Sequence, residues 1–203
     1  GGEVRFNTQV TDLVTEDGAV KAVVTADGEQ IPCDRCILAI GHSARDTFEM
    51  LHESGIRMES KPFAMGVRIE HKQSAIDLAQ YGSNELPLPP ADYKLVKHLE
   101  DGTVYTFCMC PGGYVVPSAD REDAVVTNGM SCFARDGKNA NSALVCSVSA
   151  EDFGGDPFKA MAFQHEIERK AFEMGGNNYK APYMTIYDFL GMKGKTHVKP
   201  SYM

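Results

Sequence analysis

The apolar run Cys36-Ile37-Leu38-Ala39-Ile40, which ends at Gly41, constrains the fold more than any other stretch of this sequence. A short apolar run that stops at a glycine is typical of a strand buried on both faces of a sheet. The glycine lets a backbone or a ligand come close, because it has no side chain. In open α/β sheets, ligands bind at the carboxyl ends of strands. The sequence therefore predicts a buried strand with a ligand site at Gly41.

Around this run, the first part of the chain predicts an antiparallel meander followed by a helix. Polar and apolar residues alternate on both sides of Glu16-Asp17-Gly18, and Asp27-Gly28 is a second hairpin signal. A helix is expected from Ser43 to about Ser54, with Ser43 and Asp46 as capping residues and Gly55 at its end.

The second part of the chain predicts many short strands and few helices. A strand over 63–71 and a helix over 74–81 come first, and close turn signals then separate strands over 93–98, 103–110, 114–117, 125–128 and 143–149. The clearest helix is 157–174, because Asp156 is an N-cap, Pro157 follows it, and Gly175-Gly176 ends it. We therefore expect an α+β fold with an antiparallel sheet or small barrel, divided into domains 1–60 and 61–203.

Composition and charge exclude some partners. The net charge of −8 argues against a nucleic-acid partner, which would require a basic surface. No apolar run approaches the ~20 residues of a membrane span, and we expect no signal peptide. We expect a cytoplasmic protein with neither nucleic acid nor membrane as partner.

The six cysteines leave a metal site as an alternative to free thiols. Cys33 and Cys36 form a Cys-x-x-Cys, and Cys108 and Cys110 a Cys-x-Cys, but these pairs lie on strand-like sequence rather than on the tight turns of zinc knuckles. A redox pair would need a cysteine at a helix N-terminus. The favoured interpretation is free cysteines that act as small buried hydrophobic residues, with Cys108 and Cys110 on one face of a strand.

Several strings resemble one family in order along the chain. They are Pro62–His71, Met109–Val116, Thr127–Ser131, Asn139–Leu144, Phe163–Phe172 and Ala181–Leu190. The family is that of uncharacterised FAD-dependent dehydrogenases, the NAD(FAD)-utilising dehydrogenases of the two-dinucleotide-binding flavoprotein group. Ala39-Ile40-Gly41 resembles the Ala-Thr-Gly strand closure beside FAD in these flavoproteins, with Ile40 in place of threonine.

The resemblance implies that this chain is an internal fragment of a longer protein. Full-length members have an N-terminal Gly-x-Gly-x-x-Gly turn, an inserted substrate or cap domain, and a C-terminal return to the FAD domain; this sequence contains no such turn. Residues 1–60 would then be a partial FAD-binding domain and 61–203 the inserted substrate/cap domain. The implied FAD contacts are Val10, which would end a strand beside the adenine, and Ala39, Gly41, His42 and Ser43.

On the substrate side, we single out Arg68, Gly112, Gly113, Asn128, Arg135 and Asn141. The glycine pair can aim backbone N–H groups at a flavin or substrate carbonyl, although a hairpin turn alone would also explain it. The side-chain amides of Asn128 and Asn141 are suited to binding a polar substrate, and Arg135 is suited to binding a carboxylate or phosphate. The alternative is a polar loop held by Asx-turns. For Arg68 and Glu70 the structural alternative is a solvent-exposed ion pair. His71 is either a proton donor near the flavin or a surface or capping histidine.

These observations favour one function and leave one alternative. The chain is expected to belong to an FAD-dependent oxidoreductase of unknown substrate, with FAD as cofactor, NAD(P)H as candidate electron donor and no assigned catalytic residue. The fragment alone is expected to be inactive. Its partners would be a small-molecule substrate, the remainder of its own FAD domain and, through exposed apolar patches, a second copy in a homodimer. The alternative is a ligand- or protein-binding module on a non-catalytic flavin fold, which the two-sided apolar helix 157–174 favours.

Overall fold

A computed structural model describes residues 2–41, 43–193 and 201. The chain divides into two compact units, Gly1–Glu59 and Ser60–Met203, each of which is described by itself. The division lies one residue from the expected boundary, while the assignment of the units to an FAD-binding domain and an inserted domain stays a prediction. The α+β class with antiparallel sheets is confirmed.

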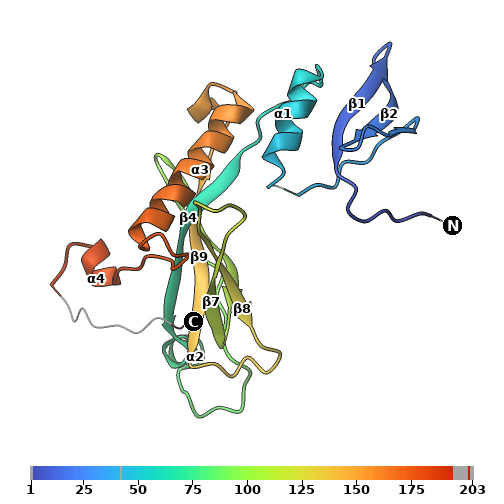
Figure 1. The fold of residues 1–203 in the computed structure, drawn as a ribbon. Coiled ribbons are helices and arrows are strands. Elements are labelled where there is room, and N and C mark those ends of the chain that lie inside the picture. The colour runs from blue at the N-terminus through green and yellow to red at the C-terminus, as the bar shows by residue number, and fades with distance from the viewer. Residues whose placement is uncertain (1, 42, 194–200, 202–203) are drawn as a thin grey trace. The chain divides into compact units, whose positions relative to one another are not determined.

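Unit 1 contains a three-stranded antiparallel sheet in the order β1-β2-β3 (Figure 1). The strands are β1 (Val10–Glu16), β2 (Ala19–Thr25) and β3 (Gln30–Pro32), joined at the predicted turns. Val10 begins β1, so the expectation that it ends a strand is wrong. Helix α1 (Arg45–Glu53) follows as predicted, but its N-cap is Ala44 and no side chain caps it, so the capping role of Ser43 and Asp46 is also wrong.

The predicted buried strand over residues 36–40 is not present. These residues form no strand, and the side chain of Ile37 is 92% exposed and that of Leu38 49% exposed. A strand is buried on both faces only within a sheet whose neighbouring strands pair with it. The sheet of unit 1 ends at β3, and the described residues offer no strand for the run to pair with. Its apolar composition alone is therefore not enough to bury it.

Unit 2 is built on a four-stranded antiparallel sheet in the order β4-β9-β6-β5. Its strands are β4 (Phe63–Lys72), β5 (Val96–Leu99), β6 (Gly102–Cys110) and β9 (Asn139–Val148). A separate hairpin consists of β7 (Gly113–Ser118) and β8 (Val126–Ser131). The helices are α2 (Gln73–Tyr81), α3 (Pro157–Met174), the short α4 (Ile186–Phe189) and the 3-10 turn η1 (Glu151–Phe153).

The register between β4 and β9 decides which residues share a face of this sheet. Directly opposite residues of an antiparallel pair point to the same side. Arg68 lies opposite Ala143 and Glu70 opposite Asn141, whereas Ile69 lies opposite Ser142 and His71 opposite Ala140. The first face lies under the β7–β8 hairpin, which runs beside β9 in Figure 1. The second face meets α2 and the segment that leads into β5.

Helix α3 begins as its sequence predicts. The Asp156 side chain accepts hydrogen bonds from the backbone N–H groups of Phe158, at 2.9 Å, and of Lys159, at 3.3 Å. Aromatic ring contacts join the helix to the sheet, because Phe153 stacks on Phe63 of β4 at 6.0 Å and meets Phe163 of α3 at a tilt at 5.3 Å, measured between ring centroids. No helix among the described residues is long and apolar enough to cross a membrane.

We predict that Asp156→Ala lowers the free energy of unfolding by about 1 kcal/mol, because two N–H groups at the start of α3 lose their acceptor. Asp156→Asn is the matched control and should stay near the wild-type value, since asparagine caps about as well as aspartate. Urea unfolding followed by circular dichroism measures both. Equal decreases in the free energy of unfolding of Asp156→Ala and Asp156→Asn would contradict the capping role of Asp156.

Candidate functional site

The main candidate site is a polar cluster on the hairpin-covered face of the sheet, formed by Arg68, Cys110, Gly129 and Asn141. The Arg68 Nη1 group donates to Asn141 Oδ1 at 2.6 Å and to the backbone carbonyl of Cys108 at 3.3 Å. Asn141 is completely buried. The alternative of a solvent-exposed ion pair between Arg68 and Glu70 is wrong. The β7–β8 hairpin covers this face of the sheet, and the Arg68 guanidinium bonds Asn141 instead of Glu70. Glu70 instead accepts from Asn139 Nδ2 at 2.9 Å.

Gly129 of β8 lets the hairpin approach this cluster closely. A Cβ at this position would lie 2.6 Å from Cys110 Sγ and would also overlap Arg68 Nη1 and Asn141 Oδ1. Any larger residue would thus push the hairpin away from the arginine. The glycine is explained by close packing rather than by its backbone conformation.

The predicted turn Pro111–Gly113 joins β6 to β7 beside the cluster, and all its residues are buried. Gly112 has a φ of 52°, in the region that favours glycine, and a Cβ there would overlap the carbonyl of Arg135. Its carbonyl accepts from Gly137 N–H at 3.1 Å, and the Ser131 hydroxyl donates to the Pro111 carbonyl at 2.8 Å. The turn is confirmed, and its role toward a flavin or substrate stays a prediction.

Gln73 is a site residue that sequence reasoning missed. Its buried side chain accepts from Gly112 N–H at 2.8 Å, and its amide donates to Asp77 Oδ1 at 2.8 Å and to the Ala91 carbonyl at 2.9 Å. It therefore ties the glycine turn to α2 and to the segment before β5. In the sequence it is an ordinary glutamine at the start of a helix, so no local signal marks it.

The cluster contains N–H donors whose partners are absent from the described part of the chain. Arg68 Nε and Asn141 Nδ2 are both buried and make no hydrogen bond there. A buried polar group without a partner costs about 1–3 kcal/mol. Both groups are donors, so a carbonyl or carboxylate oxygen is the chemistry that would satisfy them.

The other predicted substrate residues lie at the edge of this cluster. Asn128 precedes Gly129 on β8 and is exposed, and Arg135 is exposed while its backbone packs against Gly112. The structure thus brings Arg68, Gly112, Gly113 and Asn141 together inside unit 2. Asn128 and Arg135 remain accessible to solvent beside them, and substrate binding by any of the six stays a prediction.

The predicted FAD contacts in unit 1 are exposed. Val10, Ala39, Gly41 and Ser43 all lie at the surface of this unit, and His42 lies outside the described residues. Gly41 has a φ of 73°, and no atom lies within 4 Å of the position that a Cβ would take. These residues fit contact with a flavin nucleotide through their backbone. They do not form the cradle of N–H groups that a diphosphate requires, because the sequence has no glycine-rich phosphate turn.

The cysteines are free, but most are not buried. Cys36, Cys108, Cys132 and Cys146 are exposed and Cys33 is half-buried, so the expectation of buried thiols holds for Cys110 alone. A bulge between Phe107 and Cys110 interrupts the alternation of β6, which explains why Cys108 and Cys110 differ in exposure. Burial raises the pKa of the Cys110 thiol, and the nearby Arg68 charge opposes this. Among the described residues, no group of three or more His, Cys, Asp and Glu could hold a metal ion.

His71 lies on the opposite face of the sheet. Its Nε2 atom is 2.7 Å from the Tyr93 hydroxyl, and the two ring centroids are 5.5 Å apart. Burial lowers the pKa of His71, and its Nδ1 atom is buried without a partner among the described residues. The interpretation as a surface or capping histidine is wrong, because the side chain is half-buried and bonded to Tyr93.

Comparison with known proteins gives one family for most of the chain. A family model described as "FAD-dependent protein, C-terminal domain-like" matches residues 62–203. A protein of Clostridium beijerinckii, described only as an uncharacterized protein, is 48% identical over 211 residues. The match covers 100% of this chain and 39% of that relative, so the chain spans well under half of the relative's length.

We predict that Cys110 resists alkylation in the folded protein, because its thiol is buried and its pKa is raised. Iodoacetamide at about pH 8 should modify Cys110 about tenfold or more slowly than the exposed Cys108, as measured by peptide mass spectrometry. In denaturant the two rates should become similar. Equal rates in the folded protein would contradict the burial of Cys110.

We also predict a pH dependence of stability that arises from His71. Because burial lowers its folded-state pKa, the unfolded chain takes up this proton first as the pH falls. The contribution of neutral His71 to the free energy of unfolding is thus fully present above pH 6.5, the ordinary pKa of histidine. It is lost as the pH falls from 6.5 through the lower pKa of His71 in the folded protein. Unfolding measured from about pH 7 to about pH 5 should show a weaker pH dependence in His71→Gln than in wild type. An unchanged slope in the variant would contradict this origin, and His98→Gln controls for removal of a histidine.

Proposed function

Because the chain belongs to the "FAD-dependent protein, C-terminal domain-like" family, we propose that it is part of an FAD-dependent oxidoreductase of the dehydrogenase or reductase class. The activity resides in a longer protein, since the chain spans 39% of its relative. FAD, when bound, supplies the hydride or electron chemistry, while protein groups bind and orient the substrate. NADH or NADPH as electron donor and a small-molecule substrate are parts of the same proposal.

The observation that carries the proposal at the level of the site is the donor pair of Arg68 and Asn141. Arg68 Nε and Asn141 Nδ2 are buried N–H donors without described partners, beside a buried glycine turn. A guanidinium fixed by a hydrogen bond to an amide is suited to binding a carboxylate or a polarised carbonyl. We therefore place the substrate-facing end of unit 2 at the polar cluster, with Gly112, Gly113, Asn128 and Arg135 around it.

Unit 1 fits a peripheral role toward FAD. Its exposed backbone at Val10, Ala39 and Gly41, and the predicted contacts His42 and Ser43, would touch the nucleotide from one side. The diphosphate would be bound by the remainder of the FAD domain, which is the expected partner of this chain. The exposed apolar run 36–40 supports this, because its composition suits a strand that pairs within a larger sheet. The homodimer is retained as a further proposal.

The test is the visible absorbance spectrum of the full-length protein, recorded anaerobically before and after addition of NADH and of NADPH. We predict flavin absorbance that bleaches with at least one of the two nucleotides. Absence of flavin would overturn the proposal. A bound flavin that neither nucleotide reduces would overturn the oxidoreductase assignment with a nicotinamide donor and would favour the binding-module alternative.

The role of the polar cluster is tested by Arg68→Lys in the same full-length protein. Lysine keeps the charge but not the planar fork, so flavin reduction should slow by about tenfold or more, the equivalent of one charge-assisted hydrogen bond. Arg57→Lys is the control, because Arg57 is exposed and pairs only with Glu59 among the interactions described for it. A melting temperature of Arg68→Lys equal to that of the wild type excludes unfolding as the cause of a slower reduction. An unchanged rate of flavin reduction in Arg68→Lys would contradict the role of the polar cluster, while the assignment of FAD as cofactor would still stand.

A further inference from the structure

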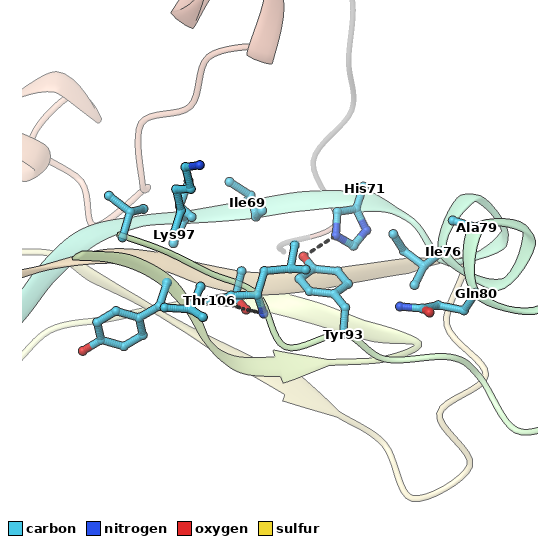
Figure 2. A pocket seen from close by; sticks show the side chains of 13 residues that line it. Ile69, His71, Ile76, Ala79, Gln80, Tyr93, Lys97 and Thr106 are labelled. Atoms are coloured by element: carbon cyan, nitrogen blue, oxygen red, sulfur yellow. Dashed lines mark hydrogen bonds between the residues drawn. The ribbon is translucent and has the colours of Figure 1, made fainter. Parts of the chain in front are cut away.

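A cavity of about 470 Å³ lies on the face of the unit 2 sheet opposite the polar cluster (Figure 2). Its size falls within the range of about 300–1,000 Å³ that is usual for small-molecule sites. The sheet, α2 and the segment 93–97 form its walls. Because side chains alternate along β4, no side chain of the polar cluster enters this cavity.

The walls are mainly apolar. Ile69, Leu144 and Val104 come from β4, β9 and β6 of the sheet, Ile76 and Ala79 from α2, and Leu95 and Val96 from the start of the edge strand β5 and the residue before it. In Figure 2 the Tyr93 ring lies between the end of the cavity near Lys97 and the end near Ile76, Ala79 and Gln80. Small apolar molecules are suited to such a site, because they replace water against aliphatic side chains.

Most polar groups in the walls already have partners. His71 Nε2 and the Tyr93 hydroxyl bond each other, and Gln80 Nε2 donates to the Asp92 carbonyl at 3.2 Å. Thr106 Oγ1 accepts from Leu95 N–H at 2.8 Å. Lys97 has no described hydrogen-bond or ion-pair partner, so it is the wall residue whose charge is available to a ligand.

The charge around the cavity is opposite to that of the whole chain. The chain has a net charge of −8, yet no aspartate or glutamate is among the residues that line the cavity. The Arg68 charge reaches through the sheet to the Tyr93 hydroxyl, whose pKa it lowers against the larger raising effect of burial. Three carboxylates are adjacent in sequence to lining residues. Glu70 lies on the other face of β4 and accepts from Asn139 Nδ2, Asp77 accepts from Gln73 and Ala91, and Asp92 does not line the cavity. An anionic group is therefore favoured at the Lys97 end.

We propose that this cavity binds a small apolar carboxylate, with its hydrocarbon part against Ile69, Ile76 and Leu144 and its carboxylate at Lys97. The proposal is independent of the function proposed above. Its residues all lie within unit 2, on the other face of the sheet, and none is one of the FAD contacts expected in unit 1. The site can thus be present or absent whether or not the full protein reduces its flavin.

The test is calorimetric titration of the full-length protein with 2-naphthoate and with its neutral analogue 2-naphthamide. We expect 2-naphthoate to bind about threefold more tightly or better, the contribution of one exposed charge pair. Lys97→Met should remove this preference while the amide still binds. Lys94→Met is the matched control, since Lys94 lies three residues earlier, is exposed and does not line the cavity.

Occupancy of the cavity itself is tested by Ile76→Trp, which fills the α2 side and should abolish binding of both probes. Ser74→Trp, at an exposed position on the opposite side of the same helix, controls for the added ring. Lack of 2-naphthoate binding to the wild type, binding that Ile76→Trp leaves unchanged, or equal affinities for acid and amide would each overturn the proposal. Should Ile76→Trp fail to fold, the Lys97→Met and Lys94→Met pair still decides it.

Discussion

The antiparallel ladder between β4 and β9 is the interaction on which both sites of unit 2 depend. It pairs every residue of β4, from Phe63 with Val148 to Lys72 with Asn139. This register puts Arg68 on the face of Asn141 and puts His71 on the other face. A slip by one residue would exchange the two faces, because side chains alternate with a period of two. One ladder thus separates a half-buried cationic cluster from an apolar cavity across the thickness of a single sheet.

Glycines at points of close approach make the half-buried Arg68 structurally tolerable. A charged side chain under a hairpin must be hydrogen-bonded, since an unpaired buried charge is costly. Gly129 lets β8 come down onto the Arg68–Asn141 pair, and Gly112 lets the segment at Arg135 pack over the turn. Arg68 Nε and Asn141 Nδ2 then lie in the same cluster without described partners, which is the physical basis for the proposal that a substrate binds there.

Local signals in the sequence predicted most of the elements of the fold. The hairpin turns at Gly18 and Gly28, the helix that starts at Asp156, and the strands β4, β6 and β7 follow from spacing, caps and turn residues. The run 36–40 shows the limit of such reasoning. Its composition predicts a strand, but pairing needs neighbouring strands that lie elsewhere in a fold, and the described residues of unit 1 provide none.

The sequence by itself determined the α+β class, the turn at Pro111–Gly113 and the residue types available for chemistry, because each depends on contacts between near neighbours in the chain. Only the tertiary structure decided that Asn141 bonds Arg68 across 73 positions of sequence, that Gln73 supports Gly112, and that His71 faces Tyr93. These contacts depend on strand register and on a bulge in β6 that changes which cysteine is buried. Register is set by the packing of the whole sheet, so no local pattern of residues encodes it.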